Sequence, residues 1–169
     1  MIDELREFAE HLERYRAVTL QTLDMVDDSE LSWRPHSDMM SLGQQFVHIA
    51  QGEDFLVHAL FYGERDEARV RLPKQVDSTD EVRAFFEEVR TRTRASLEEI
   101  EATGLSFLVG DPPATRLSRL WGLVEHEVHH KAQIALYLRL LGKVPPFFNE
   151  VLEPGSRPDV EYREKLGGV

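Results

Sequence analysis

Three of the seven histidines in this sequence fall within five residues, at His126, His129 and His130. Successive residues of an α-helix are rotated by about 100°, so residues four apart lie on one face, one turn apart. His126 and His130 could therefore bind the same metal ion, whereas His129 points about 100° away from His130. Two imidazoles seldom hold a metal firmly, so a third ligand must come from another segment.

His48 is the candidate for that third ligand. It lies in the middle of a second helical segment, and the small residue Gly52, one turn later, leaves space beside it. A three-histidine site leaves coordination positions for water or substrate, which is typical of catalytic rather than structural zinc. Imidazole suits several divalent metals, of which we expect zinc or nickel. The alternative is that these histidines are structural, and we expect the other four, including His129, at the surface.

Glu53 stands in the middle of the apolar stripe of the same segment as His48. A carboxylate in that position costs free energy unless it is paired or hydrogen-bonded. One interpretation is catalytic: Glu53 would be a general base or the partner of a ligand imidazole. The other is a salt bridge between helices, which the sequence alone favours.

The elements that must position these residues are four amphipathic helices, because apolar residues recur at three- and four-residue steps in four long segments. The predicted helices cover about residues 3–27, 42–62, 79–103 and 114–141. Ser41 with Gln44, and Ser78 with Glu81, are typical of helix starts. We expect the fourth helix to be the most buried, because it is apolar around most of its circumference.

The predicted fold class is all-α: a four-helix bundle with long loops and a short C-terminal extension, which includes a helical candidate at 159–166. The connections, about 10 to 15 residues long, are expected to fold over one end of the bundle and shape a pocket there. Phe147 and Phe148 are expected to pack onto the bundle.

Length and charge set the broad class. The 169 residues fit one domain, 1–169. With 20 Lys+Arg against 31 Asp+Glu, the net charge of −11 disfavours nucleic acid as a partner. The absence of cysteine excludes disulfides, thiolate-bound metals and a cysteine nucleophile. The sequence shows neither a membrane-spanning run nor a secretory signal, so we expect a cytoplasmic protein, with a homodimer as a plausible assembly.

Several of these residues carry a resemblance to a known family. They are Leu31, Trp33 and Pro35 ahead of Ser41, the segment FVHIAQGEDFL (46–56), and the segment EHEVHHKAQIALYLRLLGKVPP (125–146). In these motifs the chain resembles the DinB/YfiT-like metalloprotein superfamily of four-helix bundles. The resemblance implies that His48, His126 and His130 are the metal ligands and that Gln133 is a supporting residue.

The resemblance also implies an activity. Characterised relatives include S-transferases and isomerases that use a low-molecular-weight thiol such as bacillithiol or mycothiol. The leading hypothesis is therefore a metal-dependent S-transferase that joins such a thiol, as cosubstrate, to a small electrophile. One alternative is a hydrolase that uses metal-bound hydroxide, with Glu53 or another acid as base. Another is a stress-associated binding protein that is not an enzyme.

Overall fold

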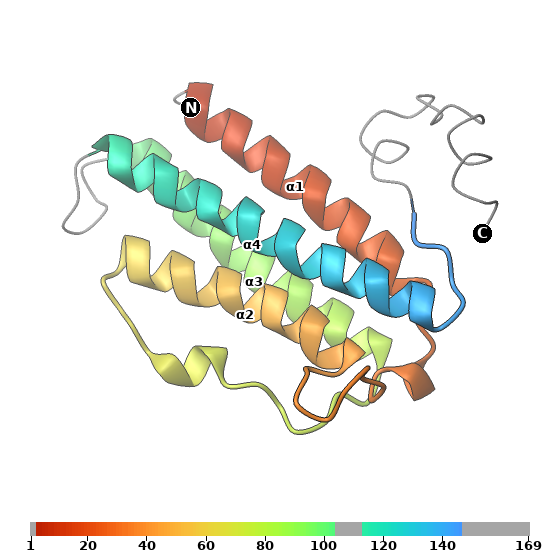
Figure 1. Cartoon of the computed structure of the whole chain (residues 1–169). Coiled ribbons are helices and arrows are strands. Elements are labelled where there is room, and N and C mark those ends of the chain that lie inside the picture. The colour runs from red at the N-terminus through yellow and green to blue at the C-terminus, as the bar shows by residue number, and fades with distance from the viewer. Residues whose placement is uncertain (1–2, 104–112, 147–169) are drawn as a thin grey trace, which may run out of the picture.

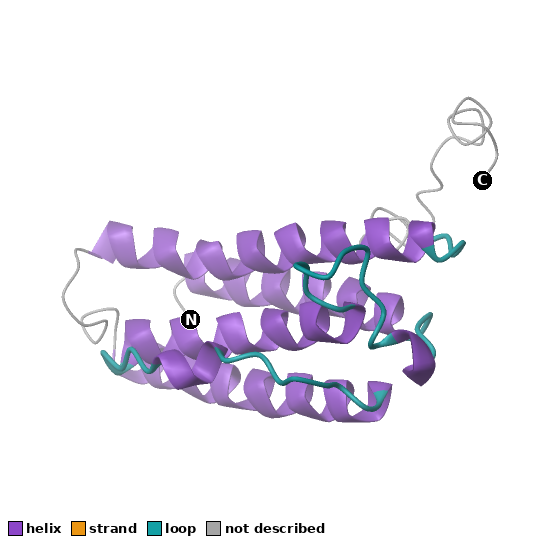
Figure 2. Ribbon diagram, turned by 60° about the horizontal axis from the view of Figure 1, so that its bottom comes forward, coloured by secondary structure: helices purple, strands orange, loops and turns teal. Residues whose placement is uncertain are grey.

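The computed structural model describes residues 3–103 and 113–146. These residues form four long helices: α1 (Asp3–Leu23), α2 (Leu42–Phe61), α3 (Thr79–Thr103) and α4 (Pro113–Leu140). Two short 3-10 helices, η1 (Asp28–Glu30) and η2 (Glu67–Val70), lie in the connections. The long helices run side by side as a bundle, and no strand occurs among the described residues (Figures 1 and 2). The predicted all-α four-helix bundle is confirmed.

Both hydrogen bonds of the cap that the sequence predicts at the start of α2 are present. The Ser41 hydroxyl accepts a hydrogen bond from the backbone N–H of Gln44 (3.2 Å), and the Gln44 side chain accepts one from the backbone N–H of Ser41 (2.9 Å). The helix stops before Gly63, whose φ of 70° is a left-handed conformation that favours glycine. These two ends fix the register of the helix that carries His48.

The first helix is shorter than predicted, since it ends at Leu23 rather than near residue 27. The backbone N–H groups of Met25 and Val26 donate to carbonyl oxygens only three residues back, which is the hydrogen-bond pattern of a 3-10 turn rather than of an α-helix. The backbone N–H of Asp27 then donates to the side chain of Glu30 (2.9 Å). This local bond, which starts η1, competes with a further α-helical turn.

The most buried helix is α2, so the prediction for α4 is wrong. Thirteen of the 20 residues of α2 are buried, whereas Leu136 and Leu140 of α4 are 56% and 60% exposed. The difference arises because α2 is covered by α3, by α4 and by the connection that follows it. In this connection the carbonyl oxygens of Arg71 and Pro73 accept hydrogen bonds from glutamine side chains of α2. It therefore runs along α2 rather than over one end of the bundle (Figure 1).

The core consists of two apolar clusters that are separated by a polar level. One cluster surrounds Phe46 and Phe86, and the other surrounds Phe8 and Leu123. In the sequence of each helix, buried charged residues lie between the positions that supply the two clusters. The predicted helix 159–166, Phe147 and Phe148 lie outside the described residues. No helix within the described ranges is long and apolar enough to cross a membrane.

Candidate metal centre

The packing of α2 against α4 brings the three predicted ligands together. His48, His126 and His130 each offer one ligating nitrogen, and these atoms all lie within 4.8 Å of one another. The ring of His48 is centred 5.1 Å from that of His126 and 4.6 Å from that of His130. His130 is buried, with 7% of its surface exposed, and the other two are half-buried. Such a cluster could bind a metal ion.

Gly52 allows the close approach of α4 at this level. A Cβ atom built on Gly52 would lie 2.3 Å from Cε1 of His126, which is far inside van der Waals contact. The space that the sequence predicted beside His48 is therefore filled by the ring of His126. Any larger residue in place of Gly52 would force that ring out of its position.

The surroundings keep the imidazoles neutral. Burial, reinforced by the neighbouring histidines, lowers the pKa of His130 to about 3, and burial followed by His48 lowers that of His126 to about 4. Burial also lowers the pKa of His48. A neutral imidazole has a lone pair to give to a metal, whereas a protonated one has none. At neutral pH the cluster is therefore in the form that binds metal.

The donor set fits a divalent ion. Zinc and related divalent transition metals bind neutral imidazoles. Three protein ligands would leave at least one coordination position of such an ion free. In addition, Nδ1 of His48 is buried and makes no hydrogen bond among the described residues. A buried polar atom of this kind normally has a partner.

Gln133 contacts the cluster through a second glutamine, and its supporting role stays a prediction. Oε1 of Gln133 accepts a hydrogen bond from Nε2 of Gln45 (2.8 Å), and Oε1 of Gln45 lies 2.8 Å from Nδ1 of His130. On its other side, Nε2 of Gln133 lies 2.8 Å from Nε2 of His129. Sequence reasoning assigned no role to Gln45, although its place three residues before His48 was a usable signal, because such residues are neighbours on one helical face.

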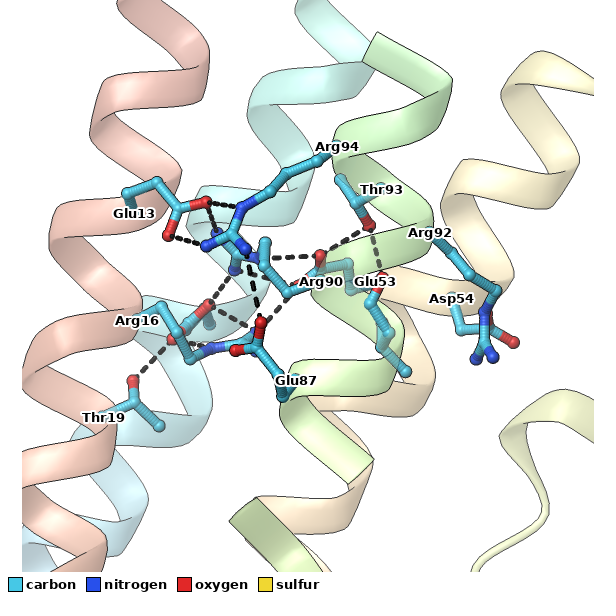
Figure 3. A network of polar contacts seen from close by, with 12 residues as sticks. Glu13, Arg16, Thr19, Glu53, Asp54, Glu87, Arg90, Arg92, Thr93 and Arg94 are labelled. Atoms are coloured by element: carbon cyan, nitrogen blue, oxygen red, sulfur yellow. Dashed lines mark hydrogen bonds and ion pairs between the residues drawn. The ribbon is translucent and has the colours of Figure 1, made fainter. Parts of the chain in front are cut away.

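Glu53 lies in a different set of contacts. One of its oxygens accepts hydrogen bonds from Arg16 of α1 (2.7 Å) and Arg90 of α3 (3.1 Å), and the other accepts one from Thr93 (2.6 Å). Burial by itself would raise the pKa of Glu53, but the two guanidinium groups outweigh it and hold this pKa below its ordinary value. Glu53 is therefore an ionised member of an interhelical ion network (Figure 3).

Glu127 of α4 completes this network. Its carboxylate accepts hydrogen bonds from Nε of Arg16 (3.0 Å) and from the hydroxyl of Thr19 (2.6 Å). Two buried arginines thus face two buried glutamates, and each of the four helices contributes one of these charges. The contacts of Glu53 agree with the salt-bridge interpretation, and its catalytic role stays a prediction. Glu127 was missed, because its position gave no reason to single it out.

Comparison with known proteins agrees with the architecture. A family model described as the DinB superfamily matches residues 11–134, well over half of the chain. The matched span contains the three clustered histidines and both supporting glutamines. No curated protein matches the sequence.

Proposed function

The chain belongs to the DinB superfamily, and from this membership and its three-histidine cluster we propose that it is a metal-dependent enzyme. The proposed reaction forms a carbon–sulfur bond between a low-molecular-weight thiol and a small electrophile: the thiol gives up its proton, and a leaving group such as halide departs from the attacked carbon. The observation that carries the proposal is the convergence of three neutral imidazoles, from two helices, within 4.8 Å of one another. Zinc or nickel is the proposed ion.

In this proposal, His48, His126 and His130 hold the ion. The bound metal supplies Lewis-acid chemistry, because it lowers the pKa of a thiol or water that reaches it. Since all three protein ligands are neutral, the charge of the ion is left uncompensated within the cluster, which favours an anionic fourth ligand such as a thiolate. The chain has no cysteine, so the sulfur nucleophile would come from the cosubstrate.

The hydrolase alternative has less support. It uses the same ion but needs a base to take a proton from water, and Glu53 or another acid was the candidate for that base. The oxygens of Glu53 are already engaged by two arginines and a threonine, and its lowered pKa makes it a weaker base. The transferase hypothesis does not require Glu53.

The test is the thiol dependence of turnover. Protein loaded with zinc or nickel would be assayed with chromogenic aryl halides and fluorogenic halobimanes, with and without bacillithiol, mycothiol or a cysteine derivative. We expect conversion above the uncatalysed rate only with thiol, and its loss in His130→Ala. His36→Ala is the matched control, because the His36 side chain is 65% exposed in a loop. Full conversion without thiol would contradict the proposal, and so would metal-loaded protein that leaves the rate with each thiol at its uncatalysed value.

A further inference from the structure

One ring nitrogen of His130 is committed to a side-chain amide. Nδ1 of His130 lies 2.8 Å from Oε1 of Gln45, at the end of the amide that can only accept. If that oxygen faces the ring, Nδ1 carries the proton and Nε2 keeps its lone pair. If the amide were reversed, its NH₂ group would face Nδ1 and the neutral ring would carry its proton on Nε2. The orientation of Gln45 therefore decides which nitrogen of His130 is free to bind a metal.

Gln133 cannot set that orientation alone. It bonds to Gln45 on one side and to the exposed His129 on the other. The amide of Gln133 could be reversed together with that of Gln45, and His129 could change its tautomer to match. A second contact of Gln45 is needed to select one of the two arrangements.

Tyr137 makes that contact. Nε2 of Gln45 lies 3.4 Å from the Tyr137 hydroxyl, and this hydroxyl gives its single hydrogen to the backbone carbonyl of Met40 (3.2 Å). The phenolic oxygen can then only accept from Gln45. A reversed Gln45 would place its carbonyl oxygen against an oxygen that has no hydrogen left to give. The backbone carbonyl of Met40 thus determines which group donates and which accepts in each hydrogen bond from Tyr137 through Gln45 to His130.

Burial raises the free-energy cost of the reversed Gln45 amide. Gln45 is 3% exposed and Tyr137 is 1% exposed, so bulk water does not compensate a wrongly oriented amide. Both residues also stand on the helices that carry the ligands, Gln45 on α2 three residues before His48 and Tyr137 on α4 seven residues after His130. The packing of α2 against α4 that brings the histidines together therefore also brings Gln45 and Tyr137 together beside His130.

We propose that Gln45, held in one orientation by Tyr137, is a positioning residue of the metal centre that fixes His130 in the tautomer whose Nε2 binds the ion. The inference rests on the proposed function for the presence of the metal. Because an amide is a neutral acceptor, unlike the carboxylates that often fill this role, it orients the ring without adding negative charge. The centre then keeps the charge that favours a thiolate.

The first test is metal affinity. The dissociation constants for Zn²⁺ and Ni²⁺ would be measured by competition with a chromophoric chelator. In Gln45→Leu we expect them to rise about 10- to 100-fold, the range for loss of such a partner. The control is Gln51→Leu, which removes another buried glutamine of α2, whose side chain donates to the carbonyl of Arg71 rather than to a histidine. Equal affinity in Gln45→Leu and wild type would overturn the inference.

The second test needs no metal. Ring ¹⁵N chemical shifts of the metal-free protein at neutral pH, with the His130 signals assigned by their loss in His130→Ala, report its tautomer directly. We expect Nδ1–H in the wild type and a mixture with Nε2–H in Tyr137→Phe. An Nε2–H tautomer in the wild type would overturn the inference. Wild-type protein that binds neither metal would instead overturn the proposed function, and the tautomer would still be measurable.

Discussion

At the scale of single residues, burial makes the clustered imidazoles poor bases. The pKa of His126 lies at about 4 and that of His130 at about 3 in the folded metal-free chain, whereas an imidazole in the unfolded chain has a pKa near 6.5. Between these values the unfolded state binds more protons than the folded state. The free energy of unfolding must therefore fall as the pH is lowered below about 6.5.

The stability of the metal-free protein should therefore depend on pH. Denaturant unfolding at pH 7 and at pH 5.5 should show lower stability at pH 5.5, in a range where most carboxylates stay ionised. In the double variant His126→Gln, His130→Gln this difference should shrink, because the residues that resist protonation are gone. An unchanged difference in the double variant would show that the two imidazoles are not held neutral by the fold.

The residues of the site were predictable where spacing along one helix sufficed. His126 and His130 follow from helical periodicity, and His48 follows from the need for a third ligand. Spacing could place Gln45 on the face of His48, but neither its contact with His130 nor the role of Glu127 followed, because both depend on how α2 and α4 are rotated toward their neighbours. Sequence periodicity gives the face of a helix but not which side chain on the neighbouring helix will meet it.

At the scale of elements, Gly52 leaves the room on α2 that the ring of His126 from α4 occupies. A Cβ there would meet the ring of His126, which is the movable end of a side chain, so the protein can fold with that ring displaced. The arrangement of the three histidines therefore depends on a glycine that is not itself a proposed ligand. Helix ends were also predictable at this scale where a cap or glycine marks them, as at Ser41 and Gly63, but not where a turn replaces the last helical residues, as after Leu23.

The corresponding prediction compares two glycines. Gly52→Ala should raise the metal dissociation constant at least about tenfold, since the displaced imidazole belongs to a proposed ligand. Gly122→Ala is the matched control, because a Cβ on Gly122 of α4 meets nothing within 4 Å. The control should leave metal affinity unchanged and stabilise the protein by about 0.5–1 kcal/mol, the usual difference between alanine and glycine in a helix. Titration and denaturant unfolding of both variants measure these effects, and wild-type affinity in Gly52→Ala would contradict the geometry.

At the scale of the whole molecule, the ion network joins all four helices at one level. Arg16 of α1 and Arg90 of α3 provide no metal ligand, but they hold Glu53 of α2 and Glu127 of α4. These two glutamates belong to the helices that carry the histidines. The apolar stripe around Glu53 predicted that this carboxylate must be paired. It could not identify the two arginine partners, because each lies 37 residues from Glu53 in the sequence.

Removing the charge of Glu53 tests whether it is structural or catalytic. Glu53→Gln leaves two buried guanidinium groups with a single carboxylate, so we expect a loss of about 3–5 kcal/mol in the free energy of unfolding. Glu10→Gln, which breaks an exposed pair with Arg14, should cost less than about 1 kcal/mol. Metal affinity of the folded Glu53→Gln protein should match the wild type. Wild-type stability together with abolished thiol transfer would instead assign Glu53 a catalytic role.

The metal itself is the most direct test. Untagged protein, purified without chelators, would be analysed for metals beside His48→Ala, His126→Ala, His130→Ala and the control His36→Ala. We predict about one divalent ion per chain in the wild type and in the control, and a large loss in each of the other three, because three ligands are the minimum for a catalytic site of this kind. A wild-type protein that is metal-free and takes up neither zinc nor nickel on titration would contradict the account.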